Sequence, residues 1–331
     1  MKEILLIATG GTIASKPTSV GLVPSITSEE IIEFVPKIAQ LCKVSTIQLM
    51  NIDSSNMDHN GWIKIANCIK ENYNKYDGFV ITHGTDTLAY SSSALSYLIQ
   101  NSKKPIVMTG SQKSIYLQDT DARKNLYDSF IFACDDNASG VHIVFDSKVI
   151  VGTRARKTRT HSYNAFDSID YPVVAVILNE KVIYYIEEKV EGDPIFYDEL
   201  NSKVSIIKLV PGINYEIFEF VGEISDVLII EGFGVGGLPC YNDENKLAKS
   251  VEKLKENGKI IVFSTSVPHE GSNIEVYQVG NEIKNSLKLL ENYNMTMEST
   301  VCKLMWITSI TKDIDKVEEM FYNPISYDIL F

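Results

Sequence analysis

The stretch ILLIATGGTIAS at residues 4–15 decides how this chain folds, because an apolar run ends abruptly in Thr9-Gly10-Gly11-Thr12. The stretch FVITHGTDT at residues 79–87 follows the same plan: a short apolar run, a glycine turn, and then Thr85 with Asp86 directly after it. Unbroken apolar runs of this length are typical of buried parallel strands. We therefore interpret both stretches as strands that deliver a threonine hydroxyl to one common site.

Length and charge limit the classes of function. A chain of 331 residues favours two domains, and 44% hydrophobic with 22% charged residues is typical of globular proteins. A formal net charge of −12 and a pI near 5.0 argue against nucleic acid or an anionic membrane as partner, because both would be repelled. We expect a small-molecule partner, with no nucleic acid and no membrane.

The cysteines are odd in number, widely spaced and free of any C-x-x-C pair: Cys42, Cys68, Cys134, Cys240 and Cys302. This pattern indicates neither a disulfide framework nor a zinc site, and the five histidines are scattered, so we expect no metal. The first apolar run, Ile4 to Ala8, is too short for a signal peptide, and no window approaches a membrane span. We therefore expect a reducing, cytoplasmic location.

Strand-like runs alternate with helical patterns, which predicts an α/β fold: a larger N-terminal domain with a mostly parallel sheet flanked by helices, and a smaller C-terminal α/β domain. We place the first domain at 1–188, a charged linker at 189–203 and the second domain at 204–331. In the first domain we expect strands at 3–8, 44–50, 78–82 and 105–109, then a hairpin of 141–145 with 148–151.

Helix signals complete the outline of the first domain. Thr27 with Glu30 predicts a capping box, and Asp121 is positioned to cap a helix that continues to about Cys134. Residues 16–26 are polar and broken by proline and glycine, so we expect a mobile loop there.

The second domain repeats the alternation of strands and helices. In it we expect strands at 204–210, 227–231 and 259–265, and helices at 244–257, 281–293, 299–309 and 312–321.

Polar residues follow four successive strands of the first domain, at Thr9–Thr12, Asn51–Asn56, His83–Thr87 and Gly110–Gln112. In open α/β sheets ligands bind outside the carboxyl ends of the strands. Each of these polar segments, or strand tails, has an ordinary explanation when taken alone: Gly10-Gly11 as a tight turn, Asp86 as a helix cap and Asp53 as a turn former. Four tails at the same edge of one sheet predict a binding site.

Nucleotide binding has little support, because neither G-x-G-x-x-G nor a phosphate-loop spacing follows the first strand. His83 suggests a serine triad, but no G-x-S-x-G elbow is present, so we interpret this histidine as structural. A threonine hydroxyl becomes a nucleophile only when a base removes its proton. The cationic run Arg154 to Arg159 contains a candidate, Lys157, although such a run is more often a solvated basic edge.

These motifs resemble those of the bacterial-type L-asparaginases. TGGTIAS and THGTDT stand as the two signature motifs of that family, and the likeness continues through NIDSSNM, PIVMTGSQ, TDARKN and GTRARKTRTHSYNAFDS. It covers nearly the whole chain and is strongest to the cytoplasmic type I branch. The resemblance implies hydrolysis of L-asparagine to L-aspartate and ammonia through a threonine acyl-enzyme, without metal or cofactor, and with a weaker glutaminase activity as a further expectation.

The resemblance also implies roles for individual residues. Thr12 matches the primary nucleophile, and Thr85 matches the second threonine, with Lys157 as its basic partner and Asp86 completing the group. Asp86 would also hold the substrate's α-ammonium. The other implied substrate-binding positions are Asp53, Ser54, Ser55 and Ser111, where Ser54 holds the α-carboxylate and the backbone carbonyl of Ser111 accepts from the side-chain amide.

The chain departs from the family pattern at two places. The family's N-terminal loop commonly carries a tyrosine that helps to activate the first threonine, whereas Val20-Gly21-Leu22 stands here and the first tyrosine is Tyr73. Ser55 stands where exported relatives have glutamine. The group that takes the proton from Thr12 stays open, with Lys157 acting through Thr85 or a water as one possibility.

Two other functions remain as alternatives. One is the asparaginase-like subunit of a tRNA-dependent amidotransferase; such subunits carry an additional N-terminal domain, whereas TGGT begins at residue 9 here. The other is a non-catalytic amino-acid sensor. Family members are dimers or tetramers in which the partner's C-terminal domain completes the site, so we expect a homo-oligomer and a use for Gly234–Leu238.

Overall fold

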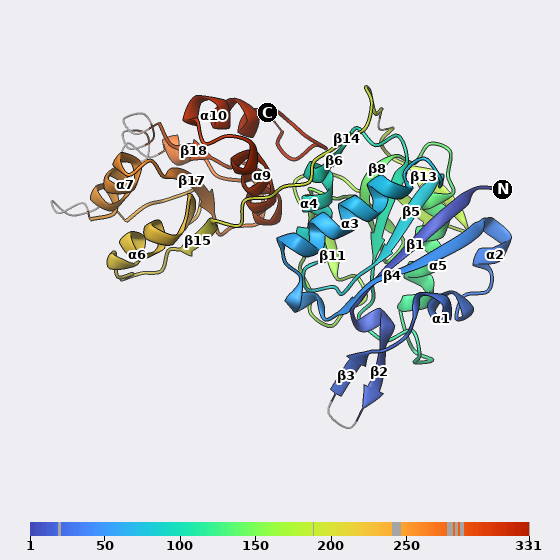
Figure 1. The fold of residues 1–331 in the computed structure, drawn as a ribbon. Coiled ribbons are helices and arrows are strands. Elements are labelled where there is room, and N and C mark those ends of the chain that lie inside the picture. The colour runs from blue at the N-terminus through green and yellow to red at the C-terminus, as the bar shows by residue number, and fades with distance from the viewer. Residues whose placement is uncertain are drawn as a thin grey trace. The chain divides into compact units, whose positions relative to one another are not determined.

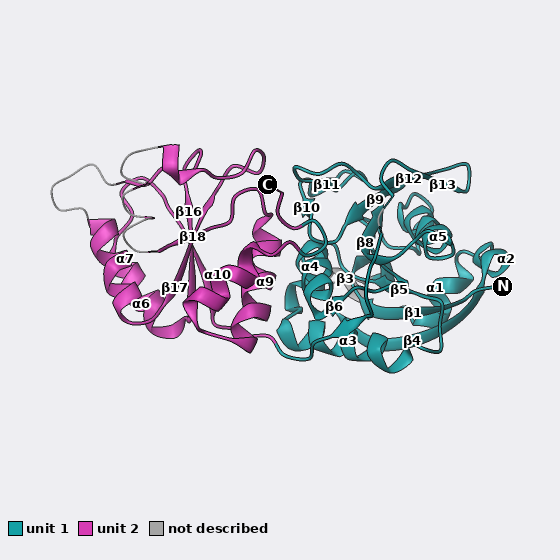
Figure 2. Ribbon diagram, turned by 90° about the horizontal axis from the view of Figure 1, so that it is seen from above, with its two compact units in different colours: residues 1–199, 325–327 teal, residues 200–324, 328–331 magenta. Residues whose placement is uncertain are grey.

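The computed structural model describes residues 1–18, 21–187, 189–239, 246–276, 281, 284 and 288–330. The chain divides into two compact units, coloured separately in Figure 2. The first holds Met1–Glu199 and Ile325–Tyr327, and the second holds Leu200–Pro324 and Asp328–Phe331. None of the helices within the described ranges is long and apolar enough to cross a membrane. Val20 and Cys240 lie outside these ranges.

A mostly parallel sheet forms the centre of the first unit (Figure 1). Its described strands run in the order β13-β12-β9-β8-β7-β5-β1-β4. The parallel part consists of β4 (Lys43–Ile52), β1 (Glu3–Gly10), β5 (Gly78–Thr82), β7 (Pro105–Thr109) and β8 (Gly140–Phe145). An antiparallel extension consists of β9 (Lys148–Val151), β12 (Ala175–Leu178) and β13 (Lys181–Tyr184). The predicted sheet type is confirmed.

Helices cover both faces of this sheet, as predicted (Figures 1 and 2). On one face lie α3 (His59–Asn72) and α4 (Leu88–Leu98), and on the other α5 (Ala122–Ala133), α1 (Ser28–Glu33) and α2 (Ile38–Leu41). Alternate side chains of β1, Ile4 and Leu6 among them, share an apolar core with Leu126 and Phe130 of α5. Because both faces are covered, nearly every side chain of β1 is buried, which explains its unbroken apolar sequence.

Short elements complete the first unit. Among them are η1 (Thr12–Ala14), η2 (Ser54–Asn56), and ribbons that pair β6 (Ile99–Gln100) with β14 (Ile195–Phe196) and β10 (Ala155–Lys157) with β11 (Phe166–Ser168). Two local sequence signals are confirmed. Thr27 and Glu30 form the predicted capping box of α1, and the β8–β9 hairpin turns at Asp146-Ser147, where both residues have positive φ, as a type I′ turn requires.

The loop predicted over residues 16–26 instead contains a two-stranded ribbon. The backbone of β2 (Ser15–Thr18) pairs antiparallel with that of β3 (Gly21–Pro24), and Ser15 lies opposite Pro24. The prolines that indicated a loop are compatible with this ribbon, because a residue without an N–H can occupy the unpaired side of an edge strand. The loop prediction is therefore wrong for the described backbone.

The second unit is a smaller α/β domain, as predicted. Its described strands are parallel in the order β15 (Val204–Lys208), β16 (Val227–Gly232), β17 (Ile260–Thr265) and β18 (Leu290–Glu291). The described helices are α6 (Glu216–Ile224), α7 (Lys246–Glu256), α9 (Met297–Ile310) and α10 (Ile314–Tyr322), with the short η3 at Ile274–Val276. Phe218 of α6 and Val251 of α7 pack with Leu228 and Ile230 of β16.

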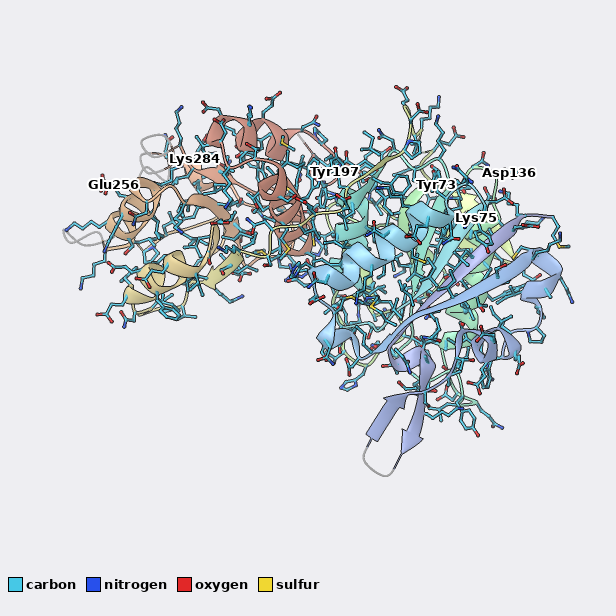
Figure 3. All side chains as sticks on the ribbon, in the orientation of Figure 1. Tyr73, Lys75, Asp136, Tyr197, Glu256 and Lys284 are labelled. Atoms are coloured by element: carbon cyan, nitrogen blue, oxygen red, sulfur yellow. The ribbon has the colours of Figure 1, made fainter. Side chains whose placement is uncertain are left out.

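Two details of the second unit differ from the sequence-based outline. Helix α6 was not expected at all. Of the helix predicted at 281–293, Asn281 and Lys284 are helical, 282–283 and 285–287 lie outside the described residues, and the last part contains strand β18 instead. Glu291 of this strand is fully buried and accepts hydrogen bonds from Lys284 Nζ at 2.7 Å and the Ile274 N–H at 2.9 Å (Figure 3 labels Lys284). These tertiary partners make burial of a carboxylate acceptable, whereas a helical pattern would leave it at the surface.

Candidate active site

Three glycines bring the ends of β1, β4 and β5 into direct backbone contact. A Cβ atom on Gly11 would lie 2.3 Å from the backbone nitrogen of Gly84, and one on Gly84 would lie 2.5 Å from the Oγ of Ser54. Gly10 is packed as closely, because its Cβ would lie 2.5 Å from backbone atoms of Ile52. No larger residue fits between these tails. The positions next to them in the chain, Thr12 and Thr85, are consequently gathered at one edge of the sheet.

Thr12 begins the short helix η1, directly after Gly11, whose φ of 78° lies in the region that favours glycine. The Gly11 N–H donates to the Ile52 carbonyl at 2.9 Å, and the Ser15 hydroxyl donates to the Gly11 carbonyl at 2.9 Å. Thr12 itself is half-buried, and its hydroxyl makes no hydrogen bond within the described part of the chain. The turn is therefore held rigidly while its hydroxyl stays available.

Lys157 joins the second threonine to the neighbouring acid. Its Nζ donates to Thr85 Oγ1 at 2.8 Å and to Asp86 Oδ1 at 2.7 Å. The side chain of Lys157 is 17% exposed and that of Asp86 67% exposed, while Thr85 is 6% exposed. A base candidate thus touches the hydroxyl on which it would act, although 72 positions separate the two residues in the chain.

The cationic run around Lys157 is not a solvated basic edge. Arg154 is fully buried, and its Nε donates to the Tyr327 carbonyl. Lys157 lies at the end of β10, and Arg159 pairs with Asp167 at 2.8 Å. The ribbon of β10 and β11 therefore presents Lys157 to Thr85 with its cationic neighbours already engaged.

The tail of β4 contributes the residues expected to bind substrate. Ser54 is 4% exposed, lies against Gly84, and accepts at its carbonyl from the Thr87 hydroxyl at 2.8 Å. Asp53 is exposed and begins η2, where its Oδ1 accepts from the Ser55 N–H and from the Ser55 hydroxyl, both at 2.9 Å. Asp53 acts as a turn former, as one interpretation allowed, and the Ser55 hydroxyl is directed to it.

Asp121 has a different role from the predicted helix cap. It occupies the N-cap position of α5, but its side chain caps nothing. Its carboxylate instead accepts from the backbone N–H groups of Gln112 at 2.9 Å and Lys113 at 3.0 Å, and burial raises its pKa. The adjacent Ser111 is fully buried and donates its hydroxyl to the Lys113 carbonyl at 2.5 Å. Asp121 therefore fixes the tail of β7 beside the other three.

Gln112 is a site residue that sequence reasoning did not single out. Its Oε1 accepts from the Thr85 hydroxyl at 3.4 Å, and its Nε2 donates to the carbonyls of Ser162 at 3.1 Å and Arg159 at 3.5 Å. The sequence signal was present, because Gln112 ends the strand tail Gly110-Ser111-Gln112. Only the folded chain shows that it touches Thr85.

His83 is structural, and its hydrogen bonds determine its tautomer. The Gly84 carbonyl only accepts, so His83 Nδ1, which lies 2.7 Å from it, carries the proton and donates. In the neutral ring Nε2 then accepts from the Ser91 hydroxyl at 2.9 Å, and Ser91 Oγ in turn accepts from the Trp62 Nε1–H at 2.8 Å. Complete burial lowers the pKa of His83 to about 4, so the ring is neutral and holds the turn before Thr85.

Comparison with known proteins gives a consistent result. A family model described as "Asparaginase, N-terminal" matches residues 3–190, and one described as "Glutaminase/Asparaginase C-terminal domain" matches residues 203–321. An L-asparaginase from Thermococcus kodakarensis is 34% identical over 329 residues, with 99% of each chain covered. The structure of L-asparaginase I from Vibrio cholerae superposes with a TM-score of 0.86 at 26% identity, covering 100% of this chain and 99% of that one.

Other similar proteins are named as amidotransferase subunits. A glutamyl-tRNA(Gln) amidotransferase subunit from Pyrococcus abyssi is 32% identical over 347 residues, which cover 99% of this chain and 77% of that protein.

Proposed function

The chain belongs to the bacterial-type L-asparaginase family, in its type I branch, and on this premise we propose that it hydrolyses L-asparagine to L-aspartate and ammonia. The observation that carries the proposal is the contact of Lys157 Nζ with both Thr85 Oγ1 and Asp86 Oδ1, at 2.8 and 2.7 Å. A hydroxyl in contact with a lysine and a carboxylate is suited to proton transfer during acyl transfer.

In the first step, Thr12 Oγ1 attacks the carbon of the side-chain amide and forms a C–O bond. The proton of Thr12 passes to the leaving nitrogen, the C–N bond breaks, and ammonia departs. Lys157 acting through Thr85 is the route that we propose for this proton, because Thr85 is the hydroxyl that Lys157 contacts. In the second step, water adds to the ester carbon, the C–O bond to Thr12 breaks, and Thr12 regains its proton.

The developing oxyanion needs donors that are already oriented. Gly11 does not offer one, because its N–H is bonded to the Ile52 carbonyl. The first N–H groups of a helix have no partner inside the helix, so we propose the N–H of Thr12, at the start of η1, as a donor.

The charges of an amino-acid substrate match the polar tails. Asp86 carries an exposed carboxylate for the α-ammonium group, and Ser54 offers a hydroxyl for the α-carboxylate. Asp53 and Ser55 shape the turn around Ser54, and the Ser111 carbonyl would accept from the substrate's amide. A weaker reaction with glutamine is part of the proposal, because one methylene changes binding by only about 1–3 kcal/mol.

Release of ammonia from L-asparagine by the purified protein, without tRNA, tests the proposal directly. We expect ammonia and L-aspartate in equal amounts. Binding without release would indicate the sensor alternative. Ammonia release that requires tRNA would indicate the amidotransferase alternative, which the likeness to the Pyrococcus abyssi protein supports.

Assembly and location complete the proposal. We propose a dimer or tetramer in which Gly234–Leu238 contributes to a neighbouring subunit's site, and a cytoplasmic location. Light scattering of the purified protein tests the first, and fractionation of cells tests the second.

A further inference from the structure

Gln112 lies between the Thr85 hydroxyl and the exposed segment that contains Arg159 and Ser162. Its side chain is half-buried, and it contacts the Thr85 hydroxyl on one side and the carbonyls of Arg159 and Ser162 on the other. Its own backbone N–H is held by Asp121 at 2.9 Å, so the side chain starts from a fixed point. These hydrogen bonds connect two strand tails and one loop, so the Gln112 side chain is held by the protein rather than only hydrated at the surface.

The two ends of the Gln112 amide can be told apart by their neighbours. The carbonyls of Arg159 and Ser162 only accept hydrogen bonds, so the NH2 group must face them. The amide oxygen then faces Thr85, and because this oxygen only accepts, the Thr85 hydroxyl must donate. The direction of the Thr85 hydrogen is therefore set by residues on two other segments.

The direction of that hydrogen determines what the Thr85 oxygen can still do. The oxygen has one hydrogen and two lone pairs. The hydrogen points to Gln112, and one lone pair accepts from Lys157 Nζ at 2.8 Å. One lone pair remains for a further proton, because no other described residue bonds to this oxygen. If the Thr85 hydroxyl could rotate freely, its hydrogen would occupy the place of this remaining lone pair part of the time.

We propose that Gln112 is a positioning residue that, before the reaction, holds the Thr85 hydrogen and so keeps a lone pair of Thr85 directed at the reacting groups; this hydrogen leaves Gln112 for Lys157 when Thr85 takes up the proton of Thr12. The inference rests on the proposed function, because it assigns the orientation of a hydroxyl in the same site. Gln112 touches no reacting atom of the substrate in this role. The Gln112–Thr85 bond is long at 3.4 Å, beyond the usual O–H···O range of about 2.5–3.0 Å, so it contributes at most as much as one ordinary neutral hydrogen bond.

Steady-state ammonia release by Gln112→Leu, Gln112→Glu and the wild type tests this role. We expect Gln112→Leu to lower kcat by about two- to tenfold, as the loss of one such bond in the transition state would do, with KM within about twofold. Gln112→Glu keeps an acceptor for Thr85 but has no N–H for the two carbonyls. We expect it to recover most of the kcat that Gln112→Leu loses.

Gln100→Leu is the matched control, because Gln100 is also half-buried and donates to a carbonyl, that of Tyr97, at 3.1 Å. It should leave kcat unchanged. Equal losses in Gln112→Leu and Gln112→Glu, a change in KM alone, or wild-type kcat in Gln112→Leu would each overturn the inference. A wild type that releases no ammonia would instead refute the proposed function.

Discussion

Gly11 and Gly84, 73 positions apart in the chain by their numbers, touch so closely that a Cβ on Gly11 would overlap the Gly84 backbone, at 2.3 Å from its nitrogen and 2.5 Å from its Cα. Each glycine immediately precedes one of the two threonines. This contact, rather than any side-chain bond, sets the approach of Thr12 to Thr85. A glycine can be required either by its backbone conformation or by the lack of space for a Cβ atom, and both apply to Gly11.

Gly11→Ala should cost more than a positive φ alone explains. Gly212 provides the control for φ, because its φ of 79° matches the 78° of Gly11 while nothing lies within 4 Å of its Cβ position. At Gly11 the close packing and a ψ of −178°, in a region that is essentially restricted to glycine, both add to the cost. We expect Gly212→Ala to lower the free energy of unfolding by about 1 kcal/mol. Gly11→Ala should lower it by about 2 kcal/mol more and abolish ammonia release. Equal losses in urea unfolding would show that space is not the constraint.

Thr12→Ala and Thr85→Ala should each reduce ammonia release by about a thousandfold or more, because each removes a hydroxyl that takes part in acyl transfer. Circular dichroism should remain that of the wild type. Thr46→Ala, in the part of β4 away from the strand tails, is the control, since among the described residues its hydroxyl bonds only to Glu29, at 2.7 Å. Turnover near the wild-type rate in either site variant would refute the assignment.

Lys157→Met and Lys157→Arg together distinguish a base from a fixed charge. Arginine retains the positive charge next to Asp86 but does not give up a proton in proteins. If Lys157 acts as a base, both variants lose activity by about a hundredfold or more, and the pH dependence of kcat changes shape. Substantial activity in Lys157→Arg, with the wild-type pH profile, would limit Lys157 to electrostatics.

His83 should make the first unit less stable in mild acid. Burial lowers its pKa to about 4 from an ordinary value of 6.5, so the unfolded chain takes up a proton before the folded one does. Stability is therefore complete above pH 6.5 and falls, by about 3 kcal/mol in all, as the pH drops towards 4. Nitrogen-15 NMR should show a neutral ring with its proton on Nδ1 at pH 6. A charged ring at that pH would contradict the proposed hydrogen-bond chain.

Lys303 and Asp328 form an ion pair at 2.7 Å in the second unit, with both side chains fully buried. Removing one partner takes from the other the buried counter-charge that it contacts, so we expect Lys303→Met and Asp328→Leu each to lower the free energy of unfolding by about 3–5 kcal/mol. The double variant should lose clearly less than the sum of the two. Additive losses in denaturant unfolding would show that the pair is not coupled.

Much of the fold was predictable because its signals are local. The apolar run of β1, the capping box at Thr27 and the turn at Asp146-Ser147 each depend on a few neighbouring residues. The failures have other origins. Asp121 stands in the sequence position of a helix cap, yet its carboxylate bonds to the backbone of the tail that follows β7. The ribbon of β2 and β3 forms despite its prolines. A tertiary partner outweighed the local preference at Asp121, whereas the ribbon is formed by two strands that are adjacent in the chain.

By itself, the sequence determined most of the order of strands and helices, though not α6 or the ribbon of β2 and β3, and it determined the polar tails that end β1, β4, β5 and β7, because apolar period and glycine turns are properties of adjacent residues. Only the tertiary structure decided which tail atoms meet. The contact of Lys157 with Thr85 spans 72 positions, and the direction of the Thr85 hydrogen depends on Gln112 and two carbonyls from a third segment. Distances and hydrogen-bond directions of this kind arise from packing, which no local pattern records.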